Sequence, residues 1–153
     1  MLILCITARP SDDNEIPAGI VSASDIDRIE IKEGDYYFQS YYGYIIDFNE
    51  NTLTETTETT EGQSKCIKYF SDEDKENFVN KANIYGFFKW KKSYSIKAED
   101  GGYTDFLVIY KDGSQHETSC DNAYPPTYKA MWDSYIEIFN NCMIKESDYE
   151  NKT

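Results

Sequence analysis

Apolar and polar residues alternate along several segments of the chain, the pattern of strands with one buried face. Ile29 and Ile31, for example, alternate with Glu30 and Lys32. Turn-forming residues such as Asp112-Gly113 separate several of these segments. We expect strands over residues 26–33 and 36–48, a solvated edge strand over 52–60, a one-sided strand over 88–98, a covered central strand over 106–110 and a returning strand over 114–120.

Two segments instead have apolar residues at helical spacing. The first helix is expected over residues 71–85, with Ser71 capping its start, acids in its first turn and Gly86 ending it. The second is expected over 127–142, where an apolar stripe runs from Tyr128 to Cys142. Trp132 lies in this stripe, and we expect it to anchor the helix to the core.

The order of these elements predicts an α+β fold, an antiparallel sheet with two helices packed on one face. Strands followed by a helix occur twice, which suggests a duplicated unit. We predict an apolar start and polar tether over residues 1–24, a single α+β domain over 25–144 and a polar tail over 145–153.

Composition narrows the classes of function. The 153 residues carry a formal net charge of −13, and 40% of them are hydrophobic. That hydrophobic content is too high for a disordered chain. The negative charge argues against binding nucleic acid or anionic lipid, because both need Lys and Arg to neutralise phosphates. The sequence also has no run of about 18 apolar residues, the length that a membrane-spanning helix needs.

The N-terminus has two interpretations. Residues 1–8 are mostly apolar but have no basic residue before them, so they are either a strand or tail at a true start, or the remainder of a signal peptide. Leu2-Ile3-Leu4-Cys5 resembles a lipoprotein cleavage box, although Leu4 replaces the usual small residue. Both a cytoplasmic protein and a membrane-anchored one therefore remain open, and a lipidated N-terminus is the only membrane tether that we expect.

Metal and cofactor sites are not predicted. Cys5, Cys66, Cys120 and Cys142 are widely spaced, and His116 is the only histidine, so the paired ligands of a zinc site are missing. We expect buried free thiols, while the sequence leaves disulfide pairing open. No nucleotide-binding or metallohydrolase motif is present, and we expect no cofactor.

Catalytic residues are not predicted either, so we expect a protein that is not an enzyme. His116 and Cys120 could suggest a nucleophilic pair, but on one strand they would lie roughly 13 Å apart. Asp72, Asp74 and Glu76 have the spacing of the start of a calcium-binding loop. The glycine and the distal glutamate of such a loop are missing, so we interpret these acids as stabilising a helix start.

Two segments are candidates for a binding surface. One face of the aromatic strand predicted over 36–48 carries Tyr37 and Tyr41, and tyrosine is enriched at interfaces. The helices or the tether could instead cover that face. Asn122 and Tyr124, in the loop over 121–126, could present a recognition surface, but Asx residues and proline there favour a structural turn.

The C-terminal part of the chain carries a recognisable pattern. It consists of Tyr-Lys-Asp-Gly-Ser at 110–114, Asp-Asn-Ala-Tyr-Pro-Pro at 121–126 and the helix that contains Trp132. The pattern resembles a group of small uncharacterised proteins of gut Firmicutes, many of them classed as lipoproteins, and it covers roughly residues 88–142. The resemblance implies an α+β domain and a place outside the cytoplasm, but no activity or site residue.

Two hypotheses follow. The first is a small non-enzymatic binding or accessory domain that recognises a protein or a small ligand, tethered at the cell surface. The alternative is a cytoplasmic acidic inhibitor or immunity-type protein that binds a basic partner through its carboxylates. An enzyme with an unrecognised carboxylate site is a third, weaker hypothesis.

Overall fold

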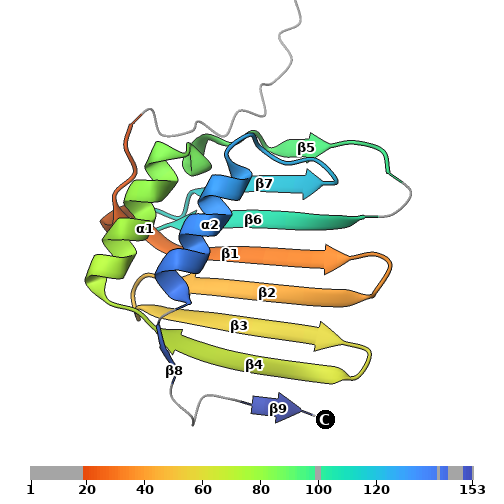
Figure 1. The fold of residues 1–153 in the computed structure, drawn as a ribbon. Coiled ribbons are helices and arrows are strands. Elements are labelled where there is room, and N and C mark those ends of the chain that lie inside the picture. The colour runs from red at the N-terminus through yellow and green to blue at the C-terminus, as the bar shows by residue number, and fades with distance from the viewer. Residues whose placement is uncertain (1–18, 99–100, 141, 145–149, 153) are drawn as a thin grey trace, which may run out of the picture.

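The computed structural model describes residues 19–98, 101–140, 142–144 and 150–152. The strands among these residues form a single sheet in the order β5-β7-β6-β1-β2-β3-β4-β8, and β9 also pairs with β4 (Figure 1). The strands are β1 (Ile26–Asp35), β2 (Ser40–Asp47), β3 (Thr52–Thr59), β4 (Gly62–Tyr69), β5 (Ser93–Ser95), β6 (Gly102–Tyr110), β7 (Gln115–Asp121), β8 (Met143–Ile144) and β9 (Glu150–Lys152). Neighbours are antiparallel except β5 and β7. With helices α1 (Asp72–Ile84) and α2 (Tyr128–Phe139), this confirms the predicted α+β class.

Strand β1 is central, paired with β2 on one side and β6 on the other. Its side chains alternate, so that Ile29 and Ile31 are buried while Glu30 and Lys32 reach the opposite face of the sheet. Figure 1 shows α1 and α2 in front of the sheet. We call the opposite face, which carries Glu30 and Lys32, the open face. The duplicated unit stays a prediction, because the two halves differ in their strands. Four antiparallel strands precede α1, whereas β5, β6 and β7, which precede α2, include the parallel pair β5 and β7.

Helix α1 begins and ends as its sequence predicts. The hydroxyl of Ser71 accepts a hydrogen bond from the N–H of Asp74, and the Asp74 carboxylate accepts one from the N–H of Ser71. This reciprocal pair satisfies two N–H groups that a helix start leaves free. Gly86, at φ 69°, takes the left-handed conformation just after the helix.

Helix α2 is fixed to the rest of the chain at both its start and its middle. The hydroxyl of Thr127, just before the helix, donates to the carbonyl of Tyr85 at 2.6 Å and accepts from Nε1 of Trp90 at 3.0 Å. Trp132 is half-buried and stacks between Tyr128 and Tyr135. It packs at the edge of the core, less deeply than the predicted anchor.

Three strand predictions are wrong in part. Residues 36–48 form no single strand, because residues 36–39 are a turn between β1 and β2. Residues 52–60 contain a strand, β3, but it is not an edge, because the unpredicted strand β4 pairs with it. Of the predicted strand over 88–98, only β5 forms; Phe87–Lys89 is instead a short 3-10 helix.

The packed part of the chain starts before the predicted domain boundary. Val21 and Ala23 are buried in the core, and the side-chain amide of Asn83 pairs with both the N–H and the carbonyl of Val21. Residues 1–18, which hold the apolar start and most of the predicted tether, lie outside the described residues. In the predicted polar tail, β9 pairs with Gln63–Lys65.

Among the described helices, none is both long enough and apolar enough to cross a membrane.

Candidate functional site

Exposed aromatic side chains gather at the turn between β1 and β2. Tyr36, Tyr37 and Phe38 are 60%, 74% and 69% exposed, and Tyr41, at the start of β2, is 48% exposed. With Tyr103 of β6, these residues form what we call the aromatic tip. Large hydrophobic side chains exposed together mark interaction sites more often than the same residues scattered singly. The aromatic tip is therefore the leading candidate for a binding surface.

The turn that carries the aromatic tip is fixed by Asp35. Its Oδ1 accepts hydrogen bonds from the N–H groups of Tyr37 and Phe38 at 2.8 and 2.9 Å. Its carbonyl accepts the N–H of Gln39 at 3.1 Å, and Gln39 takes a left-handed conformation at φ 51°. An Asx side chain that bonds the backbone two and three residues ahead holds a turn in one shape. The exposed rings are thus presented from an ordered turn.

Strand β6 supports the aromatic tip from the side. The ring of Tyr103 lies against Gly34, where an added Cβ would be 2.3 Å from Cε1 of the tyrosine. The rings of Tyr36 and Tyr103 are 5.5 Å apart, and the N–H of Tyr36 donates to the carbonyl of Gly101. Only a glycine at position 34 leaves room for this arrangement.

The structure places the four predicted binding residues at the same end of the sheet but not in one cluster. Tyr37 lies in the turn and Tyr41 in β2, both within the aromatic tip. Asn122 follows β7 and has a φ of 57°. Its side chain packs against Gly101, where an added Cβ would lie 1.6 Å from Oδ1 of Asn122. That close packing supports the structural interpretation of Asn122. Tyr124 is 41% exposed and contacts Tyr128, with ring centroids 4.3 Å apart.

A cluster of polar side chains lies between α2 and the sheet, and we did not predict it. The hydroxyl of Tyr44 donates to Oε2 of Glu33 at 3.2 Å, and Tyr128 also hydrogen-bonds to that carboxylate. Burial raises the pKa of Glu33, while these two hydrogen bonds lower it. Burial, with the charge of Glu33 next, also raises the pKa of Tyr128 to about 12, so this phenol stays neutral.

The same cluster continues to Glu55 of β3. Its carboxylate pairs with Lys68 at 3.0 Å and accepts a hydrogen bond from Tyr135 of α2. Tyr44 packs edge-on against both Trp132 and Tyr135. These side chains join one helix to three strands, so we interpret the cluster as the attachment of α2 to the sheet. No local sequence pattern could have indicated it, because its members lie far apart along the chain.

The weaker catalytic and metal candidates do not assemble into a site. Burial, with the charge of Asp105 second, raises the pKa of the Cys120 thiol to about 11, so it is poorly suited to act as a nucleophile. Burial lowers the pKa of His116, and its Nε2 has no hydrogen-bond partner among the described residues. Asp72 bonds Asn51 and Lys75, and Asp74 caps α1. In the described part of the chain no group of three potential ligands could hold a metal ion, and Cys120 and Cys142 are free thiols.

A comparison of the chain with protein-family models, with curated proteins and with solved structures finds no match.

Proposed function

We propose that this chain is a non-enzymatic binding domain that recognises a protein partner through the aromatic tip. The observation that carries the proposal is the exposure of Tyr36, Tyr37 and Phe38 in one turn together with Tyr41 at the start of the next strand. A folded protein rarely exposes so many large rings side by side without a partner that covers them. Tyrosine also contributes large contact area at a low cost in side-chain entropy, which suits an interface.

The order of the turn supports the same proposal. Because Asp35 already holds the turn in one shape, a partner that binds the rings does not have to order the backbone as well. Binding to a preorganised surface loses less conformational entropy and is correspondingly tighter.

The acidic surface supports the alternative function less well. Several of its carboxylates already accept hydrogen bonds from turns, helix starts or neighbouring side chains, so part of their hydrogen-bonding capacity is used within the fold. They include Asp35, Asp47, Asp72, Asp74 and Asp112.

The proposal is tested by site-specific photo-crosslinking. A photoreactive phenylalanine analogue replaces Tyr37 in one variant and Ile84 in a control, since Ile84 is 72% exposed on α1, away from the turn. Each variant is exposed to an extract of the native cells. A partner should crosslink at position 37 and not at position 84.

The captured protein is then purified and its affinity measured by calorimetry. Tyr37→Ala and Tyr41→Ala should each weaken binding about tenfold or more, as truncation of an interface tyrosine does. Raising the salt from about 0.1 M to about 1 M shortens the Debye length from about 10 to about 3 Å. This change should weaken binding less than either tyrosine substitution does. Silent tyrosine substitutions with a steep salt dependence would reject the aromatic tip in favour of the acidic inhibitor.

A further inference from the structure

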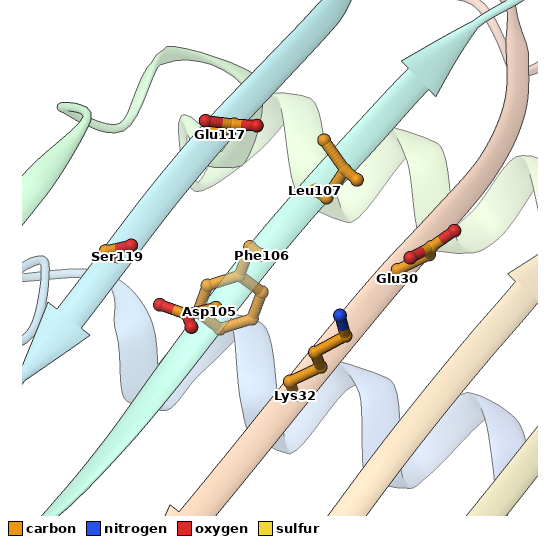
Figure 2. Close-up of a pocket in the computed structure, with 7 residues that line it drawn as sticks. All are labelled: Glu30, Lys32, Asp105, Phe106, Leu107, Glu117 and Ser119. Carbon is orange, nitrogen blue, oxygen red and sulfur yellow. The ribbon is translucent and has the colours of Figure 1, made fainter.

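The open face of the sheet has a depression of about 250 Å³ beside the aromatic tip. Figure 2 shows the face that the helices do not cover, with side chains of β1, β6 and β7 around the depression. Its lining residues are Glu30, Lys32, Asp105, Phe106, Leu107, Glu117 and Ser119. The volume is below the usual range for a cofactor or drug-sized ligand, and it suits a single side chain.

Two carboxylates of the depression lack a partner of their own. Among the described residues, Asp105 and Glu117 make no ion pair or side-chain hydrogen bond, whereas Glu30 is bonded by Nε of Arg28 at 2.8 Å. Asp105 pairs in register with Ser119, and Leu107 with Glu117. Asp105 and Glu117 are therefore diagonal neighbours on adjacent strands, with Cα atoms about 7–8 Å apart.

This arrangement favours a cation with several donors. Two carboxylates on neighbouring strands can be bridged by a planar guanidinium, which has five N–H donors. Half-buried Leu107 lies next to both and offers an apolar surface to the methylene stem of the same side chain. Lys32 of β1 is the cross-strand partner of Asp105 and lies one strand further from Glu117, so Glu117 is the less compensated of the two charges.

We propose that the depression receives an arginine side chain of the protein partner, an inference that rests on the proposed function above. Tyr103 of the aromatic tip and Asp105 lie two residues apart on β6 and share the open face. A partner that covers the aromatic tip therefore reaches the depression within about 7–13 Å, two to four residues of extended chain. The partner is expected to carry an apolar anchor and an arginine at that separation.

The test uses Nα-acetyl-arginine amide as the probe, followed by the amide NMR signals of the full chain. Saturable shifts are expected at Asp105, Leu107 and Glu117. The citrulline amide has the same shape without the charge and should produce none. Equal binding of the lysine amide would overturn the choice of a guanidinium.

A matched pair of double variants separates the depression from general acidity. Asp105→Asn with Glu117→Gln should weaken the probe about tenfold, the factor for one hydrogen bond to a charged group. Glu58→Gln with Glu137→Gln removes the same charge at exposed positions outside the depression and should change the affinity little. An equal loss in both double variants, shifts spread over the whole acidic surface, or no saturable shift would each overturn the inference. Thermal unfolding confirms that both double variants are folded.

The inference and the proposed function can fail separately. Tyr37→Ala should leave arginine-amide binding unchanged, because the ring is outside the depression. If the partner binds the aromatic tip and Asp105→Asn with Glu117→Gln leaves its affinity unchanged, the arginine assignment is wrong while the binding function stands. If the probe binds but no partner crosslinks at position 37, the proposed function fails and the depression remains a guanidinium site.

Discussion

The hydroxyl of Tyr135 in α2 donates a hydrogen bond of 3.3 Å to Oε1 of Glu55 in β3, although 80 positions separate the two residues. Lys68 of β4 pairs with the same carboxylate, and the Lys68 side chain is only 12% exposed. One carboxylate therefore connects a helix with two neighbouring strands in a partly desolvated place. The contact fixes where α2 lies on the sheet.

Tyr135→Phe is expected to lower the free energy of unfolding by about 1–2 kcal/mol, because it removes a hydrogen bond to a charged, partly buried acceptor. The ring contacts with Tyr44 and Trp132 remain in the variant. Urea unfolding measures the change. Tyr124→Phe is the control, since this exposed tyrosine makes no hydrogen bond within the described residues and its loss should change stability by less than about 0.5 kcal/mol. Equal effects of the two changes would contradict the role of the Tyr135 hydroxyl.

Glu33→Gln is expected to stabilise the protein at pH 7. Burial raises the pKa of Glu33 in the fold, so its stabilising contribution is fully present below the unfolded pKa, about 4.3, and is lost as the pH rises through the folded value. Glutamine stays neutral and keeps an oxygen for the Tyr44 hydroxyl. The thermal midpoint of the variant should exceed that of the unchanged chain at pH 7, and the difference should disappear below pH of about 4.

Glu58→Gln at an exposed position of β3 is the matched control for charge. A similar gain in this control would assign the effect to the general reduction of negative charge. A lower midpoint for Glu33→Gln at pH 7 would show that the ionised carboxylate stabilises the fold.

Sequence patterns predicted the elements whose signals are local. The start of α1 is set by Ser71 and Asp74, which are three positions apart, and its end by Gly86. The strand predicted over 36–48 failed because its alternation continues through a turn. The bonds from Asp35 to Tyr37 and Phe38 define that turn, and aromatic residues there gave no sign of it. Even so, Tyr37 and Tyr41 were selected from the sequence as candidates for a binding surface.

Long-range contacts explain the remaining errors. Residues 88–98 alternate like a strand, but Trp90 is buried against Phe87 and Phe106 and bonds Thr127, so packing overrides the pattern. Strand β4 was missed because Gly62–Tyr69 has few apolar residues and gains its partners from β3. The depression on the open face combines residues of three strands, whose register no local pattern reveals.

Removal of residues 1–23 is expected to destabilise the domain by about 2–4 kcal/mol. The deletion exposes the site that Val21 fills and leaves the Asn83 amide without its two partners on Val21. Removal of residues 1–18 alone, which keeps those contacts, should preserve the thermal midpoint. Asn83→Ala in the full chain tests the same contact without a deletion. If the chain lacking residues 1–23 has the same thermal midpoint as the chain lacking residues 1–18, the packing of Val21 contributes nothing to stability.

Gly34 gives the ring of Tyr103 its place at the side of the aromatic tip. Gly34→Ala places a Cβ 2.3 Å from Cε1 of Tyr103, so the ring must swing away, and we expect a loss of about 1–3 kcal/mol, the usual cost of overpacking. In a Tyr103→Ala background that clash is gone, and Gly34→Ala should be nearly neutral. The double-mutant cycle, measured by urea unfolding, should give an interaction energy on the order of 1–2 kcal/mol. Gly34 does not have a positive φ, so alanine is not strained there for backbone reasons. An equal cost of Gly34→Ala in both backgrounds would mean that the Tyr103 ring does not impose the glycine, and the proposed support of the aromatic tip by β6 would then be wrong.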